Sequence, residues 1–186
     1  MTAADDAVRA SVESLLGTDA VTVLPSGRVA VRPERASSIA ELLRWAAQES
    51  VVVRTLPRRW LDRRRTFPGA GEVLLSLDRL RGSLVLDQVS SIATVPAGVT
   101  GAELAWRLHR EGRWVRPRPL PFYTRTLGSY LAGPGMASEM TALTMWESPL
   151  MALEAVLADG RVLKAGVAPR SAAGPDYRAF LLGTGD

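Results

Sequence analysis

Five arginines follow Pro57 within a short stretch, and they are the residues through which this chain could bind an anion: Arg58, Arg59, Arg63, Arg64 and Arg65. A guanidinium group can bind a phosphate through two parallel charge-assisted hydrogen bonds. Trp60 and Leu61 add bulk to the same stretch, and Pro57 lacks an amide donor. The stretch can therefore form a phosphate site, although the sequence favours a solvated basic loop or a surface for a partner.

The composition excludes several other kinds of chemistry. The chain has no cysteine, which removes disulfides, thiolate metal sites and cofactors attached to cysteine. Its single histidine, His109, excludes a site with several histidine ligands, and we interpret it as a residue on the surface of a helix. No metal site is expected, and the catalytic residues are unknown from the sequence.

The formal net charge is +4, and Lys164 is the only lysine. Abundant arginine, alanine, valine and leucine fit a bias in genome composition, and no nucleic-acid recognition motif is present, so we expect no nucleic-acid partner. No apolar run approaches the roughly 20 residues that span a bilayer, and residues 1–6 lack the features of a signal peptide. We therefore expect a cytoplasmic protein without a membrane span.

The first third of the chain alternates helical and strand patterns. Apolar residues at helical spacing predict a helix over 2–17, and two β-rich runs at 20–24 and 28–32 predict a hairpin. Ser38 and Glu41 have the spacing of a capping box, which predicts the start of a second helix. A continuous apolar run at 50–54 predicts a buried strand.

Short strands and two further helices are expected after this. Strands are predicted at 73–77, 83–87 and 91–96, and a second capping box, Thr100 with Glu103, begins a helix through Arg110. Prolines predict an extended or turned segment at 117–121, and Asp159-Gly160 predicts a hairpin of 152–157 with 161–164. Asp176 is expected to cap a last helix through Leu182.

These elements predict an α+β fold of two lobes in a single domain over 1–186. The first lobe, at about 18–58, is a βαβ unit, and the second, at about 73–186, is a larger mixed sheet with flanking helices. We find no internal repeat and no long linker.

Several segments, in this order, resemble one known domain. They are Val31-Arg32-Pro33, the stretch from Val73 to Leu80, the stretch from Ala93 to Thr100, and Pro169 to Asp176 followed by Leu182-Gly183-Thr184. The chain is similar to the FAD-binding domain of the vanillyl-alcohol oxidase and p-cresol methylhydroxylase type. Within that group it looks like FAD-linked oxidases such as glycolate or D-lactate oxidase subunits and alkyl-dihydroxyacetone-phosphate synthase.

The resemblance implies that FAD lies between the lobes and is held without a covalent bond, largely by backbone amides. In the family a glycine-rich loop binds the pyrophosphate after the strand that corresponds here to 50–54, so Arg54 leads into that loop. The other cofactor-binding positions that it implies are Thr126, Leu127, Gly128, Ser129, Gly133, Gly135, Pro175, Gly183 and Thr184.

The chain departs from the family pattern in three places. The arginine-rich stretch replaces the glycine loop, Met145 to Pro149 replaces a segment that carries an acid, and the sequence stops at Asp186, where the family continues into a substrate domain. One hypothesis is an FAD-binding domain or subunit of an FAD-linked oxidoreductase whose substrate half is elsewhere, for example in a partner chain. The alternative is a degenerate flavin fold without FAD that serves as a binding or scaffold module.

Overall fold

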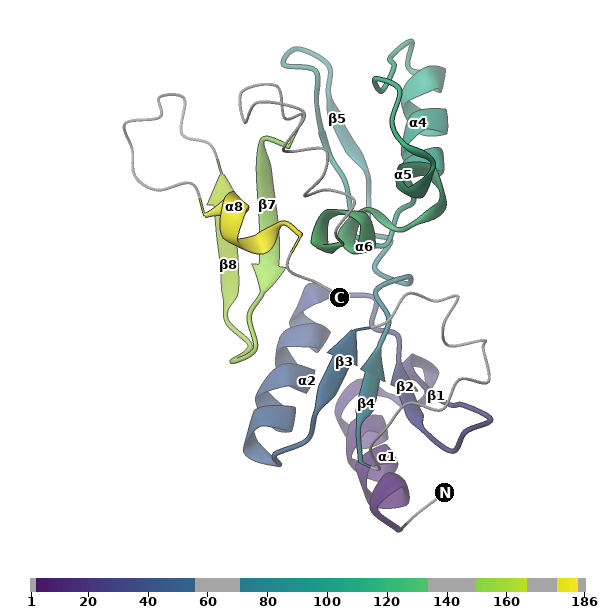
Figure 1. Ribbon diagram of the computed structural model, residues 1–186, viewed down its shortest axis with the longest axis vertical. Helices are drawn as coiled ribbons and strands as arrows, with labels where there is room; N and C mark the ends of the chain where they lie inside the picture. The colour runs from purple at the N-terminus through teal and green to yellow at the C-terminus, as the bar shows by residue number, and fades with distance from the viewer. Residues whose placement is uncertain (1–2, 56–70, 134–149, 167–176, 184–186) are drawn as a thin grey trace.

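The computed structural model describes residues 3–55, 71–133, 150–166 and 177–183. One group of elements surrounds a four-stranded sheet with two helices beside it, and a second group contains two hairpins and several shorter helices (Figure 1). The expected α+β class is confirmed. Within the described ranges, no helix has both the length and the apolar character needed to cross a membrane.

The four-stranded sheet is built from β1 (Val21–Val23), β2 (Val29–Val31), β3 (Val53–Thr55) and β4 (Val73–Leu75), in the order β1-β2-β4-β3. β1 and β2 form the expected antiparallel hairpin, while β4 runs parallel to both β2 and β3. We expected residues from 73 onward in the second lobe, but β4 lies inside the first sheet. A strand between two neighbours is shielded on both sides, and all three β4 residues are buried.

Because β4 occupies the inner position, β3 lies at the outside of these four strands. Val53 is half-buried, and Arg54 and Thr55 are exposed. The expectation of a buried strand at 50–54 was therefore wrong. The apolar run is real, but one of its valines, Val52, is 52% exposed.

Two helices, α1 (Ala3–Leu16) and α2 (Ala36–Gln48), pack against one face of this sheet. Their apolar residues form one cluster with alternate residues of β2 and β4, as the side-chain period of two in a strand requires: Val12, Leu42, Ile39, Val29, Val31, Val73 and Leu75. The intervening residues Ala30 and Leu74 form a small cluster with Leu24. The first helix ends as predicted at Gly17, whose φ is 85°.

The two predicted capping boxes have different outcomes. Helix α2 begins at Ala36, and its N-cap is Arg35, which makes no side-chain capping bond, so the box predicted at Ser38 and Glu41 was wrong. The helix starts earlier because the carbonyl of Arg35 already accepts the Ile39 amide at 3.4 Å. The second box was correct: Thr100 caps α4 (Gly101–Arg110), and Glu103 reaches back to the Thr100 amide.

The second group of elements contains two separate two-stranded sheets in the described residues, where we expected one larger mixed sheet. They are β5 (Val85–Asp87) with β6 (Ile92–Thr94), and β7 (Ala152–Val156) with β8 (Val162–Gly166). The second is the hairpin predicted at Asp159-Gly160. Its turn packs on α2, because a Cβ added to Gly160 would lie 2.6 Å from the Ala40 carbonyl oxygen.

The described residues also include three short helices, α5 (Leu120–Thr124), α6 (Leu127–Ala132) and α8 (Arg178–Leu181), and a 3₁₀ turn, η1 (Thr18–Ala20), which precedes β1. The proline-rich stretch was expected to be extended or turned, but Pro121 lies in the first turn of α5, where its missing amide costs nothing. The N-cap of α8 is Tyr177, and Asp176, which we expected to cap this helix, lies outside the described residues. Phe122, Tyr130 and Leu182 form the core of this region.

Candidate functional site

The carboxyl ends of β2, β4 and β3 lie at one edge of the first sheet, because these strands are parallel. In open sheets with parallel strands, ligands bind outside this edge. Arg32 follows β2 there, and Ser76 and Asp78 follow β4. The arginine-rich segment leaves β3 at the same edge after Thr55, and its residues 56–70 lie outside the described part of the chain.

Asp78 organises this edge. Its two carboxylate oxygens accept hydrogen bonds from Arg32, at 3.1 Å from Nε and 2.5 Å from a terminal nitrogen, and Ser76 Oγ donates to Oδ1 at 2.8 Å. Arg81 Nε donates to the backbone carbonyl of Asp78 at 2.9 Å. Asp78 is only 5% exposed, so this ion pair fixes a buried carboxylate between the ends of two strands.

The loop after β4 packs directly against the loop before α4. The Gly98 amide donates to the Leu80 carbonyl at 3.0 Å, and the Leu80 amide donates to the Leu77 carbonyl at 3.0 Å. A Cβ on Gly98 would lie 2.6 Å from the Leu80 oxygen, so only glycine permits this approach. The loop at 96–100 is thereby attached to the end of the first sheet.

Helix α6 is attached to the same loop through its first amides. Leu127 N donates to Val99 O at 2.8 Å, Gly128 N donates to Ala97 O at 2.8 Å, and Ser129 N donates to Thr126 Oγ1 at 3.3 Å. Figure 1 shows α6 between the first sheet and the α4 region. This turn therefore lies beside the carboxyl edge of the first sheet, and its three amides are used within the chain.

Two charged side chains, Glu103 and Arg81, lie beside the N-cap residue Thr100. Glu103 Oε2 accepts from the Thr100 amide at 2.9 Å, and Arg81 approaches Glu103 Oε1 at 2.8 Å. The hydrogen bond from the Thr100 amide has the largest effect and lowers the pKa of Glu103; burial opposes it, and the Thr100 hydroxyl and the Arg81 charge lower the pKa further. The carboxylate is therefore held in its ionised form.

Most of the predicted cofactor-binding positions that the structure describes lie in or beside α6, whereas Arg54 lies away from them. Gly133 is the C-cap of α6, and the Gly183 amide donates to the Leu131 carbonyl of that helix at 2.9 Å, so both lie beside Thr126–Ser129. Arg54 lies apart, exposed on the outer strand β3, where it pairs with Glu72 at 3.3 Å. Gly135, Pro175 and Thr184 lie outside the described residues.

Sequence reasoning did not identify Arg32 and Asp78 as a pair. The available signal was an acidic residue directly after a buried apolar strand, because a carboxylate at such a position needs a partner. The arginine that supplies this partner is 46 residues away in the sequence, and nothing in the local pattern connects the two.

The diphosphate of FAD needs several hydrogen-bond donors that converge on it, so the amides of the turn at 126–129 would have to be free to donate. The amides of Leu127, Gly128 and Ser129 all have acceptors within the chain. The space beside Gly128 is also filled, since an added Cβ would lie 3.0 Å from the Ala97 Cβ. The turn at 126–129 is therefore not an amide cradle for phosphate.

This two-part α+β arrangement is that of the FAD-binding domains of the p-cresol methylhydroxylase type. The family model described as "FAD binding domain" matches residues 27–166, and the chain belongs to this family. No curated protein sequence matches the chain.

Solved structures show the same fold. A 4-ethylphenol oxidase from Gulosibacter chungangensis is 19% identical with a TM-score of 0.68, over 98% of this chain and 40% of its own. A p-cresol methylhydroxylase is 17% identical with a TM-score of 0.67, over 98% and 41%. An alkyldihydroxyacetonephosphate synthase is 22% identical with a TM-score of 0.61, over 84% and 28%. The chain thus spans less than half the length of each of these proteins.

Proposed function

We propose that this chain is the FAD-binding part of an FAD-linked oxidoreductase, with the substrate part supplied by another segment or by a partner chain. The main support is the family match over 27–166, together with a sheet edge that faces the α6 turn. FAD, when bound, would supply the redox chemistry by accepting electrons from the substrate. The chain's own residues would bind and orient the cofactor without a covalent bond.

The arginines take the role of the missing glycine loop in this proposal. Arg58 and Arg59 follow β3, and guanidinium groups can replace amides as donors to a diphosphate. Arg54 would lie at the start of this segment. The turn from Thr126 to Ser129 and the glycines at 133, 135 and 183, with Pro175 and Thr184, would border the same cofactor, with contacts other than the three amides already used.

The test is to measure FAD binding directly. The purified chain should show the absorbance of a flavin, or its unfolding temperature should rise with added FAD, because a ligand that binds only the native state stabilises it. Replacing Arg58 and Arg59 by alanine should weaken FAD binding by at least about tenfold, since each lost charge-assisted bond contributes about 1.5 kcal/mol or more. Arg161→Ala, at the exposed β7–β8 turn, is the matched control and should bind FAD as the wild type does.

One observation favours a second function, a flavin fold that has lost its cofactor and serves as a binding or scaffold module. The amides at 127–129 are satisfied by the chain itself. A colourless protein whose unfolding temperature ignores FAD would support this function and overturn the first. Pyrophosphate-dependent stabilisation lost in the Arg58 and Arg59 variant would support the first.

We also propose a cytoplasmic location and no nucleic-acid partner. The absence of cysteine is consistent with a reducing compartment, since such a chain cannot form disulfides. Cell fractionation of the tagged full-length protein is the check, and recovery in an extracytoplasmic fraction would contradict the location.

A further inference from the structure

Apart from the arginines at 58–65, a second cluster of positive charge lies in one short stretch of the chain. Residues 106–116 contain four arginines and one glutamate, a net charge of +3 with histidine neutral, while the whole chain carries +4. The stretch covers the end of α4 and the extended segment after it. This stretch and residues 58–65, which carry five arginines and one aspartate, together exceed the net charge of the whole chain, so the other residues are net negative.

Ring contacts connect these residues into one surface. The Arg110 guanidinium carbon lies 4.9 Å from the centroid of the Trp106 ring, and the His109 and Trp114 rings meet edge to face at 6.3 Å. Trp106, His109 and Arg110 share one face of α4 because residues three and four apart are neighbours on a helix. We call this the Trp–Arg surface: Trp106, Arg107, His109, Arg110, Arg113 and Trp114.

The charges of this surface are not neutralised by the protein itself. Several other arginines pair with carboxylates, as in Arg9 with Glu13 and Arg81 with Glu103. In the described ranges, Arg107, Arg110 and Arg113 form no ion pair. Trp106 is 60% exposed and Trp114 is 78% exposed, although tryptophan and arginine are the residues most enriched where protein interfaces are strongest.

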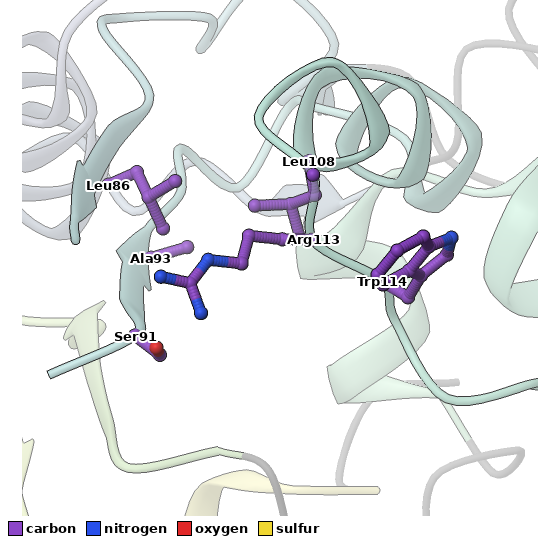
Figure 2. Close-up of a pocket in the computed structure, with 7 residues that line it drawn as sticks. Leu86, Ser91, Ala93, Leu108, Arg113 and Trp114 are labelled. Atoms are coloured by element: carbon purple, nitrogen blue, oxygen red, sulfur yellow. The ribbon is translucent and has the colours of Figure 1, made fainter. Parts of the chain in front are cut away.

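A hollow of about 360 Å³ adjoins this surface, between the β5–β6 hairpin and the end of α4. Its walls include the aliphatic side chains of Leu86, Ala93 and Leu108, and Arg113 extends across it toward the hairpin (Figure 2). Arg113 also donates to the Gln88 carbonyl at 3.2 Å, which holds the guanidinium in place. The hollow can therefore receive an apolar side chain beside a fixed positive charge.

We propose that the Trp–Arg surface binds an acidic protein partner, which places carboxylates on Arg107, Arg110 and Arg113 and an apolar side chain in the hollow. Acidic side chains of the partner would complement the clustered arginines. An apolar side chain of the partner would pack against the leucine and alanine side chains that line the hollow. The proposal is independent of whether FAD is bound.

The geometry favours a protein over nucleic acid or a lipid surface. Bases stack on open aromatic faces, but one face of Trp106 carries Arg110. A lipid surface favours aliphatic and aromatic side chains that protrude from a basic face; Trp106 and Trp114 are exposed here, but the aliphatic side chains line a hollow. The hollow and the adjacent charges instead match the combination of apolar anchor and charged rim found in protein interfaces.

The test uses the full chain and a fluorescein-labelled, glutamate-rich peptide that carries one central leucine. Fluorescence anisotropy should show binding that weakens as salt is raised from about 50 to about 300 mM, because screening shortens the reach of exposed charges. Replacing every glutamate of the peptide by glutamine, or the leucine by serine, should each weaken binding by at least about threefold.

The double variant Arg107→Glu with Arg110→Glu should reduce affinity for the peptide by at least about tenfold, and Trp114→Ala by at least about threefold. Arg35→Glu, an equally exposed charge reversal at the start of α2, is the control and should bind as the wild type does. Because all these side chains are exposed, unfolding temperatures should agree with that of the wild type, which separates lost binding from lost folding.

Three outcomes would overturn the proposal. The first is that the peptide does not bind, and the second is that it binds the double variant as well as it binds the wild type. The third is that polyuridine, or vesicles of phosphatidylserine, bind the Trp–Arg surface more tightly than the peptide does. The last result would assign the surface to a nucleic acid or to an anionic membrane.

Discussion

Arg32 and Asp78 are joined by two hydrogen bonds that connect the end of β2 to the loop after β4. The two residues follow adjacent parallel strands, and the carboxylate is buried while the guanidinium is partly exposed. The pair therefore fixes the spacing of the strand ends at the carboxyl edge of the first sheet.

Asp78→Asn should lower the free energy of unfolding by about 2 to 3 kcal/mol. The substitution removes the buried carboxylate charge that faces the partly exposed Arg32 guanidinium, and one bond of the pair is lost. Urea unfolding followed by circular dichroism measures the change. Glu154→Gln, which removes the exposed pair with Lys164, is the control and should change stability by less than about 0.5 kcal/mol. Equal losses in both variants would contradict the role of the buried pair.

Gly101→Ala should destabilise the protein by about 2 kcal/mol even though alanine favours helices. A Cβ at this position would meet the Phe122 ring at 2.5 Å and its backbone carbonyl even more closely, so α4 and α5 would have to separate. Ala102→Gly, one residue further along α4 and exposed, isolates helix propensity and should cost about 1 kcal/mol or less. If the Gly101→Ala protein were as stable as the wild type, α4 and α5 would be able to accommodate the added methyl group against Phe122 without loss of stability.

Glu103→Gln should lower stability by about 0.5 kcal/mol at neutral pH, a value reduced for the partial exposure of the carboxylate. The pKa of Glu103 is lower in the folded protein, so its contribution is present above the ordinary glutamate pKa of about 4.3 and is lost as pH falls through the folded value. The stability difference between variant and wild type should therefore disappear in acid.

Glu41→Gln is the matched control for this pH dependence, because Glu41 has the sequence spacing of a capping box but α2 begins too early to use it. Chemical unfolding at a series of pH values compares the two variants. A pH dependence of the same size in Glu41→Gln would mean that the Thr100 cap is not the cause.

Arg28→Ala and Arg54→Ala should differ, although both arginines pair with Glu72. The Arg28 side chain is 13% exposed and the Arg54 side chain is 48% exposed. Loss of Arg28 should cost about 1 to 2 kcal/mol, because Glu72 is buried with it, while loss of Arg54 should cost less than about 0.5 kcal/mol. Thermal unfolding gives both values, and the reverse order would contradict the burial argument.

Local patterns predicted the local elements well. The hairpin of β7 and β8 follows from Asp159-Gly160, and the start of α4 follows from Thr100 and Glu103, because each depends on residues adjacent in sequence. The box at Ser38 and Glu41 failed because an equivalent spacing can occur inside a helix. Only the backbone bond to Arg35 decides where the helix begins.

The strand order and the site were less accessible to sequence reasoning. Nothing near Val73 indicates that its strand enters between β2 and β3, because strand pairing is a long-range property. The amides of Leu127 and Gly128 suited a phosphate as well as they suited a backbone carbonyl. Their acceptors, Val99 and Ala97, lie about thirty residues away in the sequence, and the packing of Gly98 brings them there.

The inner position of β4 also has a consequence for the order in which this chain can fold. β2 and β3 do not pair with each other, and each bonds to β4. A nascent chain that has emerged only to residue 58 has both neighbours of β4 but lacks β4 itself, so the four-stranded sheet cannot form until residue 75 is available. Fragments cut between β3 and β4 should therefore fail to fold alone and should recover structure only when the two pieces are mixed.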